Sequence, residues 1–217
     1  MGSDADLRGR LSVLNTALLA DVMDQLGFRD SAFGPDIKPM EPKQKLVGRA
    51  FTMRCVSLAE PAERPYEHLL AAYDDIGEGD VIVLHCADRT SAMWGELLST
   101  AAKVKGAVGA VMDGVTRDVE QTLEVGFPVF SAGYSPLDSS GRQEVVEHGS
   151  TVGCGLATVS PGDWIVGDIM GVVVIPSAMV EEVVSRAEAK DTGESTVREE
   201  LLRGDSIGDV FQRNGIL

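Results

Sequence analysis

The order of the expected elements predicts an α/β or α+β fold with a mixed β-sheet flanked by helices. Helix, strand and turn patterns follow one another in quick succession between residues 92 and 134. Residues 81–86 (VIVLHC) form a continuous apolar run, which is typical of a central strand. Residues 46–56 alternate instead, and two short strands within 164–175 have the spacing of a hairpin. Because continuous and alternating strands both occur, the sheet should be mixed.

The first part of the chain divides at its glycines and prolines. The elements expected before residue 90 are a helix over 8–27, a loop over 28–45, strand 46–56, a helix over 65–76 and strand 81–86. Asn15 or Thr16 can cap the first helix, and Gly27 ends it. Arg49 and Arg54 on the first strand are expected to be solvated or paired with acids rather than catalytic.

Residues 92–134 organise the rest of the chain. An apolar run at helical spacing begins after Ser91 or Ala92, and Gly106 ends it as a left-handed cap. Strand 108–112, the turn Asp113-Gly114, a helix opened by Arg117-Asp118 and ended at Gly126, and strand 128–131 follow. An acidic and a basic side chain are thus delivered to the carboxyl end of a strand, where ligands bind in open α/β sheets.

The last third of the chain is expected to return to strands and then become helical. Its expected elements are a polar irregular stretch with a short helical piece over 133–149, strand 151–160, strands 164–166 and 171–175, a helix from Ser177 to about Lys190, and a helical tail over 194–203. The length of 217 residues suits a single domain over 1–217 with a helical tail from about residue 177.

Composition and net charge limit the cellular compartment and the kinds of partner that we expect for the protein. No apolar stretch approaches the roughly 20 residues that span a bilayer, and residues 1–4 lack the features of a secretory signal, so we expect a soluble, cytoplasmic protein with no membrane partner. The net charge of −15, from 34 acidic and 19 basic residues, predicts no nucleic-acid partner. It leaves room for a basic protein partner, and for a small anion where an arginine and a metal ion reverse the local potential.

Several familiar chemistries find no support in the sequence. There is no phosphate-binding GxxxxGK[ST] loop, no HExxH and no GxSxG, and Gly153-Cys154-Gly155 is only a fragment of a dinucleotide fingerprint. The three cysteines (Cys55, Cys86 and Cys154) are widely spaced, so we interpret them as buried thiols in a reducing compartment. Three histidines make an imidazole zinc site improbable, whereas plentiful carboxylates suit Mg²⁺ or Mn²⁺.

The spacing of Glu96, twenty further residues and Arg117-Asp118 resembles the signature of the RraA-like family. This family takes in class II 4-hydroxy-4-methyl-2-oxoglutarate aldolases and regulators of ribonuclease activity. Further matching pieces are Asn15-Thr16 with Asp21, residues 94–98 (WGELL), Asp113-Gly114, residues 127–130 (FPVF), and Pro161-Gly162-Asp163 leading to residues 172–176. The likeness spans roughly residues 8–190. It implies a swivelling β/β/α domain assembled as a trimer or a dimer of trimers.

The resemblance also implies roles for the residues of this signature. Asp118 would be the ligand of a divalent metal ion, Mg²⁺ or Mn²⁺, and Arg117 would stabilise the enolate of a 2-oxo acid substrate. The backbone of Gly95, Glu96, Leu97 and Leu98, at the start of a helix, would bind the substrate carboxylate. Glu96 would help to place a water molecule on the metal. Without the resemblance, Arg117-Asp118 would be interpreted as a helix start whose aspartate complements the helix dipole.

The function implied is a metal-dependent lyase that releases pyruvate by retro-aldol cleavage of 4-hydroxy-4-methyl-2-oxoglutarate-type substrates and decarboxylates oxaloacetate. The alternative is a non-catalytic inhibitor of a ribonuclease. A methyltransferase label also used in the family finds no glycine-rich adenosylmethionine loop here. The sequence departs from the aldolase pattern at two places: Gln121 replaces an acidic residue, and the late acidic cluster is reduced to Asp168-Ile169-Met170.

Overall fold

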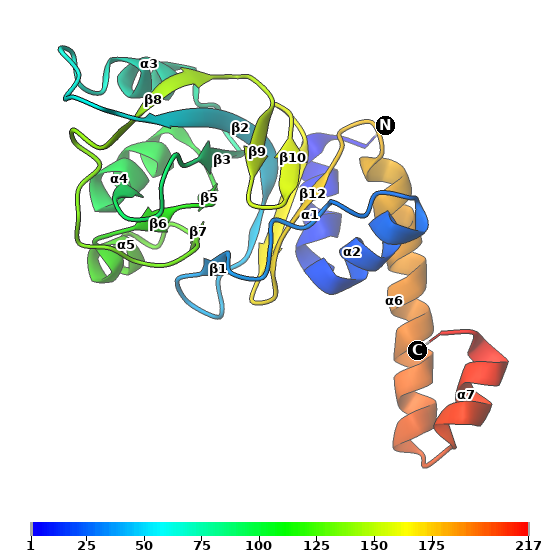
Figure 1. Ribbon diagram of the computed structural model, residues 1–217. Coiled ribbons are helices and arrows are strands. Elements are labelled where there is room, and N and C mark those ends of the chain that lie inside the picture. The colour runs from blue at the N-terminus through cyan, green and yellow to red at the C-terminus, as the bar shows by residue number, and fades with distance from the viewer. Residues whose placement is uncertain (1, 217) are drawn as a thin grey trace.

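A nearly closed, mixed β-sheet flanked by helices forms the centre of the molecule (Figure 1). The computed structural model describes residues 2–216, so Met1 and Leu217, the ends of the predicted domain 1–217, lie outside the described residues. Within that range the main sheet runs β1-β7-β5-β3-β2-β11-β12, and β8 pairs with the second half of β2. Its strands are β1 Lys38–Pro39, β2 Leu46–Ser57, β3 Asp80–His85, β5 Gly109–Met112, β7 Val129–Ser131, β8 Gln143–His148, β11 Trp164–Asp168 and β12 Gly171–Ile175.

The sheet mixes parallel and antiparallel pairs as the sequence predicts. β2, β3, β5 and β7 are mutually parallel, and β3 is an inner strand of this group, between β2 and β5. β11 and β12 form the predicted antiparallel hairpin, which pairs with the first half of β2. β2 therefore joins the parallel half of the sheet to its antiparallel half.

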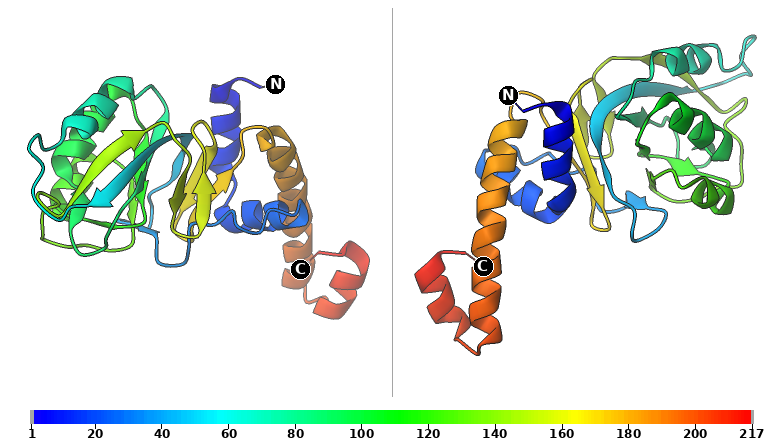
Figure 2. Two further views of the ribbon diagram at one scale, coloured as in Figure 1. Left: turned by 45° about the horizontal axis from the view of Figure 1, so that its top comes forward. Right: turned by 180° about the vertical axis from the view of Figure 1, so that it is seen from behind.

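Helices cover two separate faces of this sheet (Figure 2). α3 Glu67–Asp75 and α4 Glu96–Lys105 pack on the parallel strands through a core that includes Leu69, Tyr73, Ala102, Ile82 and Met112, and α5 Val119–Val125 lies beside α4. α1 Asp4–Val13, α2 Thr16–Gln25 and α6 Val180–Leu202 pack on β11 and β12 around residues such as Leu11, Leu19, Trp164 and Val184. No helix within residues 2–216 combines the length and the apolar character that a bilayer crossing requires.

A third core fills the inside of the curved sheet. It is covered by the hairpin of β9 Val152–Cys154 and β10 Ala157–Val159, and it contains Phe33, Val83, Val111, Phe130 and Ile165. The prediction of one strand over 151–160 is therefore wrong. Gly155 turns the chain there with φ of 61°, and a Cβ at this position would lie 1.8 Å from the carbonyl oxygen of Phe33. Only glycine fits that turn.

The predicted helix over residues 8–27 is two helices. Leu14 is extended, and the side-chain oxygen of Asn15 accepts a hydrogen bond from the N–H of Leu18 at 2.8 Å, so Asn15 begins a new helix. Asparagine favours such caps because its side chain satisfies an N–H that the helix leaves unpaired. Gly27 follows α2 with positive φ, as predicted.

Residues 133–149 were expected to be irregular with a short helical piece. Residues 133–142 are irregular, but no helix lies within 133–149 and residues 143–148 form a strand. The strand β8 ends this stretch, and its Gln143 and Val145 are buried. The buried Gln143 hides the alternation of the strand, because its amide replaces an apolar side chain: it donates to the carbonyl oxygen of Ser91 at 2.8 Å and accepts from the N–H of Ala87 at 3.1 Å.

The C-terminal helices differ from the prediction in their limits. α6 runs without a break through the two predicted helical segments, and α7 Ile207–Asn214 folds back along its end. Ser177 does not cap α6, since its N–H donates to the carboxylate of Asp163 and Met179 occupies the cap position. Figures 1 and 2 show the far end of α6 and α7 extending away from the sheet. The single domain over 1–217 stays a prediction.

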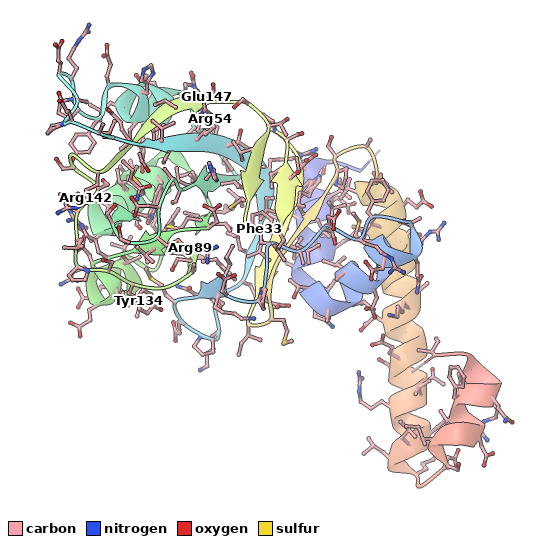
Figure 3. The ribbon with its side chains drawn as sticks, in the orientation of Figure 1. Phe33, Arg54, Arg89, Tyr134, Arg142 and Glu147 are labelled. Carbon is pink, nitrogen blue, oxygen red and sulfur yellow. The ribbon has the colours of Figure 1, made fainter. Side chains whose placement is uncertain are left out.

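Arg49, Arg54 and the three cysteines have the structural roles that the sequence predicts. Arg49 pairs with Asp4 at 2.7 Å, and Arg54 on β2 pairs with Glu147 on β8 at 2.7 Å (Figure 3). All three cysteines are free and buried. Contact with Cys55 together with burial raises the pKa of the Cys86 thiol, and burial raises that of Cys154. Such thiols stay protonated and are poor nucleophiles.

Candidate active site

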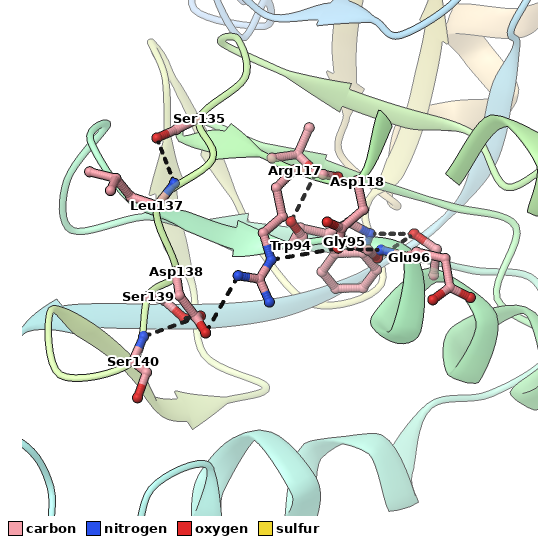
Figure 4. Close-up of polar contacts among 12 residues, drawn as sticks. Trp94, Gly95, Glu96, Arg117, Asp118, Ser135, Leu137, Asp138, Ser139 and Ser140 are labelled. Carbon is pink, nitrogen blue, oxygen red and sulfur yellow. Dashed lines mark hydrogen bonds and ion pairs between the residues drawn. The ribbon is translucent and has the colours of Figure 1, made fainter. Parts of the chain in front are cut away.

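A two-stranded parallel pairing brings the two halves of the predicted signature together. β4 Ala92–Trp94 pairs with β6 Val115–Thr116, strands that the sequence did not reveal. The N–H of Arg117 and the hydroxyl of Thr116 both donate to the carbonyl oxygen of Trp94, each at 3.0 Å. Because α4 begins two residues after Trp94, its N-terminus lies beside Arg117 and Asp118 (Figure 4).

The start of α4 agrees with the placement of Gly95–Leu98 at a helix start, but it comes later than the apolar run after Ser91 or Ala92 predicts. A helix from residue 92 would lose the β4 pairing and would unseat Trp94, which is 1% exposed and stacks on Phe127. The helix begins at Glu96 instead, after Gly95. The indole N–H of Trp94 donates to the hydroxyl of Ser99, which in turn donates to the carbonyl oxygen of Gly95. These bonds fix the first turn of α4 to the buried indole.

Asp118 lies directly against this helix start. Its Oδ2 accepts a hydrogen bond from the N–H of Glu96 at 3.4 Å, and a Cβ at Gly95 would come within 2.5 Å of the same oxygen. Gly95 is therefore required by the close approach of the carboxylate. Asp118 occupies the cap position of α5 but makes no side-chain cap there. Its carboxylate faces the start of α4, so it does not serve its own helix.

The backbone of Asp118 is strained. Its φ of 54° and ψ of 44° lie in the left-handed region, which costs a non-glycine residue about 1–3 kcal/mol. Among the described residues only Tyr66 and Asp118 combine a side chain with positive φ. Both line the same cavity. Strain of this kind gathers at binding sites, where the surrounding structure holds it in place.

The first turn of α4 offers unpaired donors to this cavity. The N–H groups of Leu97 and Leu98 have no hydrogen-bond acceptor within residues 2–216, as expected in the first turn of a helix. The carbonyl oxygen of Leu98 accepts from the Tyr73 hydroxyl at 2.9 Å. Burial raises the pKa of Tyr73, so this hydroxyl stays protonated and holds the turn against α3. The turn thus presents fixed N–H donors of the kind that bind anions at helix starts.

The guanidinium of Arg117 is held only loosely. Its Nε lies 3.5 Å from Asp118 and its Nη1 lies 3.4 Å from Asp138, and the side chain is 36% exposed (Figure 4). Within the described part of the chain it donates no hydrogen bond as short as a normal one. Two acids therefore orient the guanidinium and leave its donors available to a ligand.

These groups surround a cavity of about 330 Å³ between α3 and α4. The residues that line it come from α3 and α4 with their cap residues, from β4, from the junction of β6 and α5 and from the loop after β7: Tyr66, Leu69, Leu70, Ala92, Met93, Trp94, Gly95, Leu97, Leu98, Arg117, Asp118, Asp138 and Ser139. Its volume is at the lower end of the range for small-molecule sites. It is large enough for a small organic acid.

Glu96 is the predicted residue that the structure places differently. Its backbone N–H belongs to the site, but its carboxylate accepts a hydrogen bond from the hydroxyl of Thr100 at 2.9 Å, one turn along α4. Its side chain does not line the cavity. The role of Glu96 in placing a water molecule stays a prediction.

Asp138 and Tyr66 are cavity residues that sequence reasoning missed. Asp138 follows β7, whose carboxyl end lies beside that of β5 in the parallel part of the sheet. Ligands bind at the carboxyl ends of strands in open α/β sheets, and applying this rule to β7 as well as to β5 would have indicated the loop that contains Asp138. Tyr66 gave no signal, because nothing in PYEHLL marks a left-handed tyrosine.

The two places where the sequence departs from the aldolase pattern, Gln121 and Asp168-Ile169-Met170, do not line this cavity. Asp168 is 7% exposed, and its carboxylate accepts hydrogen bonds from the N–H and hydroxyl of Thr16 and from the N–H of Met170. Gln121 lies on α5 and does not line the cavity.

The carboxylate oxygens at the cavity are ligands of the kind that a hard divalent cation prefers. Within residues 2–216 no cluster of three or more His, Cys, Asp or Glu side chains has the arrangement of a metal centre. Mg²⁺ needs no such cluster, since one or two carboxylates often hold it while water and substrate complete its shell. The side chain of Asp118 is 41% exposed, and the missing Cβ of Gly95 leaves room beside its Oδ2.

Comparison with known proteins assigns this fold and this cavity to a family. The family model for RraA-like proteins (Aldolase/RraA) matches residues 16–174. An uncharacterised protein of Methanocaldococcus jannaschii is 35% identical over 182 residues, which are 81% of this chain and 82% of that protein. A Halalkalibacterium halodurans protein named "Putative 4-hydroxy-4-methyl-2-oxoglutarate aldolase" is 31% identical over 189 residues, which are 87% of this chain and 85% of that protein.

A solved structure supports the same assignment. RraAS2 of Streptomyces coelicolor, described as an unusual member of the RNase ES inhibitor RraA protein family, has a TM-score of 0.81 and 26% identity, covering 91% of this chain and 98% of its own. This chain belongs to the RraA-like family. The fold predicted from the signature is confirmed, and the lyase prediction is supported at the level of the family.

Proposed function

We propose that this protein is a carbon–carbon lyase that acts on small 2-oxo acids in the cavity between α3 and α4. The observation that carries the proposal is the fixed first turn of α4, whose unpaired N–H groups lie beside the strained Asp118 and the loosely held Arg117. Such a turn binds a carboxylate. A cation beside it can stabilise the negative charge that develops when the carbon–carbon bond breaks.

Asp118, with its exposed carboxylate, is the residue that would hold Mg²⁺ or Mn²⁺. When bound, the ion supplies a Lewis acid that draws electrons from the keto group. Asp138 is assigned to orienting Arg117 instead, because one of its carboxylate oxygens lies 3.4 Å from Nη1 of Arg117 and the other accepts a hydrogen bond from the N–H of Ser140 at 3.3 Å.

The chain itself would bind and orient the substrate. The N–H groups of Leu97 and Leu98 receive the carboxylate of the 2-oxo acid, and Gly95 keeps this approach open. Arg117 donates to the oxygen that becomes the enolate oxygen, a contribution of about 3–4 kcal/mol for preorganised donors. Glu96 would orient a water molecule for proton transfer, which requires its carboxylate to leave Thr100.

Two reactions share this requirement. Retro-aldol cleavage of a 4-hydroxy-4-methyl-2-oxoglutarate-type substrate and decarboxylation of oxaloacetate both leave an electron pair on the same pyruvate enolate. A site that binds the 2-oxo acid end and stabilises the enolate therefore supports both. The name of the Halalkalibacterium halodurans relative supports the first reaction for this chain.

The experiment is an assay of pyruvate release from a panel of 2-oxo acids, oxaloacetate included, with Mg²⁺, with Mn²⁺ and with EDTA. The account predicts turnover that EDTA removes and added metal restores. Arg117→Ala should abolish this turnover, and Val104→Ala, on an exposed position of α4 outside the cavity, is the matched control. An Arg117→Ala variant with full activity and an unchanged EDTA response would refute the proposal.

The alternative function is inhibition of a ribonuclease without turnover. The net charge of −15 favours it, because an acidic surface complements a basic RNA-binding region, and RraAS2 is described as belonging to an inhibitor family. Purified RNase ES, the enzyme in the description of RraAS2, assayed with the wild type and with Arg117→Ala separates the two functions. Equal inhibition by both, without turnover of any 2-oxo acid, would favour the inhibitor.

We further propose that the protein assembles as a homotrimer or a hexamer and binds no nucleic acid. The first part rests on the family, and the second on the net charge of −15. Light scattering at micromolar concentration tests the assembly, and a monomer would contradict it. Salt-sensitive, submicromolar RNA binding would contradict the second part.

A further inference from the structure

Trp94 lies behind both charged residues of the signature. Its backbone carbonyl oxygen accepts the N–H of Arg117 at 3.0 Å. Its indole N–H donates to the hydroxyl of Ser99 at 2.8 Å. Trp94 and Ser99 are 1% and 0% exposed, so the bond between their side chains lies inside one chain and does not depend on the assembly of subunits. The buried indole is therefore a fixed point from which further contacts can reach the cavity.

A continuous chain of hydrogen bonds runs from this indole to Asp118. The hydroxyl of Ser99 accepts from the indole and donates to the carbonyl oxygen of Gly95 at 2.9 Å. The peptide group that contains this oxygen also contains the N–H of Glu96, which donates to Oδ2 of Asp118 at 3.4 Å (Figure 4). Each group donates in the direction of the carboxylate, and hydrogen bonds arranged in this way polarise and strengthen one another.

This chain sets the orientation of the peptide group between Gly95 and Glu96. Gly95 has no side chain with which to hold it, and the N–H and the hydroxyl of Ser99 both donate to its carbonyl oxygen, at 3.1 and 2.9 Å. Loss of the hydroxyl would remove one of these two bonds and would leave the buried indole N–H without its acceptor. The bond to Asp118 is already long, so a small rotation of the peptide group would break it.

Asp118 is held at one oxygen and open at the other. Oδ2 accepts the N–H of Glu96 and lies 3.5 Å from Nε of Arg117. Within residues 2–216, Oδ1 accepts no hydrogen bond. A carboxylate that is fixed through one oxygen presents the other in a defined direction, and this is how hydrogen bonds to a metal ligand raise its affinity for the ion.

We propose that Ser99 is a positioning residue for the metal ion that Asp118 would hold. The inference rests on the proposed function, since it takes Asp118 as the metal ligand. Ser99 does not line the cavity, and it acts through the peptide group of Gly95 and Glu96, which holds Oδ2 of Asp118. Groups that orient a metal ligand in this way contribute about 10–100-fold to metal affinity.

The test is a titration of the intact protein, treated with EDTA and dialysed, with Mn²⁺ alone, in which electron paramagnetic resonance measures the free ion. We expect Ser99→Ala to weaken Mn²⁺ binding about tenfold or more. The Mn²⁺ concentration that gives half-maximal oxaloacetate decarboxylation should rise by the same factor. At saturating Mn²⁺, kcat should change less than about threefold, because Ser99 contacts no reacting atom.

Two further variants at the same position test the role of the hydroxyl. Ser99→Thr keeps a hydroxyl that can bond the carbonyl oxygen four residues earlier in a helix, so it should bind Mn²⁺ within about threefold of the wild type. Ser99→Cys keeps the volume but offers only a weak donor and acceptor, so its affinity should lie between those of Ser99→Thr and Ser99→Ala. It also replaces Ser99→Ala in the test if that variant does not fold.

Thr52→Val is the matched control for a loss of stability. Thr52 is buried on β2, its hydroxyl donates to the backbone carbonyl oxygen of Ser150 at 2.6 Å, and it does not line the cavity. Its replacement therefore removes a buried hydrogen bond of the same kind as that of Ser99. Thr52→Val should lower the melting temperature, as Ser99→Ala does, and leave Mn²⁺ binding unchanged.

The outcomes distinguish this inference from the proposed function. If the wild type binds Mn²⁺ and Ser99→Ala binds it as tightly, the inference is wrong and the proposed function stands. The inference is also wrong if Ser99→Ala and Thr52→Val weaken Mn²⁺ binding equally, since a loosened fold would then explain the loss. If the wild type binds no Mn²⁺, the metal requirement of the proposed function fails, and the inference fails with it.

Discussion

Asp118 and Asp168 show how differently one fold uses the same side chain. The carboxylate of Asp168 is buried and accepts three hydrogen bonds of 2.7–2.8 Å, which join the β11–β12 turn to the start of α2. The carboxylate of Asp118 is 41% exposed and accepts one bond of 3.4 Å, on a backbone that is strained. Both carboxylates lie at the start of a helix that is not their own.

The difference separates structural from functional carboxylates. A carboxylate whose oxygens are satisfied within the chain lowers the energy of the fold and has little capacity left for a ligand. A carboxylate that is held in place with exposed lone pairs costs the fold little, because water solvates those lone pairs until a ligand replaces it. By this criterion Asp168 stabilises the fold and Asp118 is available for chemistry.

Exchanging each carboxylate for its amide tests the comparison most strongly. Asp118→Asn should reduce oxaloacetate decarboxylation about 1000-fold, because about 4 kcal/mol of charge stabilisation is lost with the metal ligand. Its free energy of unfolding should change little. Asp168→Asn should instead lower the free energy of unfolding by about 1.5–3 kcal/mol and leave the activity of the folded protein unchanged. Urea denaturation and the decarboxylase assay measure both, and exchanged outcomes would contradict the comparison.

Arg117→Lys tests whether the guanidinium of Arg117 acts in the transition state or only binds the substrate. Lysine keeps the charge near Asp118 and Asp138 but loses the planar fork of donors. We expect kcat to fall about 100-fold with a smaller change in KM, as for a donor that acts in the transition state. Steady-state kinetics with oxaloacetate measure this, and a change confined to KM would show that Arg117 only binds the substrate.

Glu96 is intermediate between the two aspartates, since its carboxylate already accepts the Thr100 hydroxyl. If it only orients water, Glu96→Gln should reduce kcat by less than about tenfold and leave the metal requirement intact. Thr100→Val, which frees the carboxylate of Glu96 from this bond, is the companion variant. A loss of activity in Glu96→Gln as large as that in Asp118→Asn would place Glu96 among the metal ligands.

The smallest expected effect concerns a surface carboxylate. The hydrogen bond from Arg49 lowers the pKa of Asp4 below its ordinary value, and burial opposes this shift. A lowered pKa stabilises the fold above the unfolded value of 3.8, and this contribution is lost as the pH falls through the folded pKa. Asp4→Asn should lower the free energy of unfolding at pH 7 by less than about 1 kcal/mol, and less in high salt. An effect as large as that of Asp168→Asn would mean that exposure does not separate these carboxylates.

Local patterns in the sequence predicted the sheet, the hairpin of β11 and β12 and the turn at Asp113-Gly114 before the helix opened by Arg117-Asp118, because continuous and alternating apolar runs and glycine caps are local signals. β4 and β6 could not be predicted, since they are only three and two residues long and exist through their pairing with each other. Gln143 misled the prediction of β8, because its buried amide finds its partners in a distant loop.

The candidate site was predictable in part through the resemblance to the RraA-like family. The spacing of Glu96, Arg117 and Asp118 carries this resemblance, which implied that these residues lie together. The direction of the Glu96 carboxylate, the left-handed backbone of Asp118 and the approach of Asp138 depend on contacts between distant segments. No local pattern carries that information.

The most direct measurement is a crystal structure of the protein with Mg²⁺ and oxalate, which resembles the enolate of pyruvate. The account predicts one oxalate carboxylate on the N–H groups of Leu97 and Leu98, an oxygen within hydrogen-bond distance of Arg117, and the metal ion on Asp118. Oxalate bound away from the start of α4, or a metal ion that Asp118 does not contact, would contradict the central claim that the cavity between α3 and α4 is the reaction site.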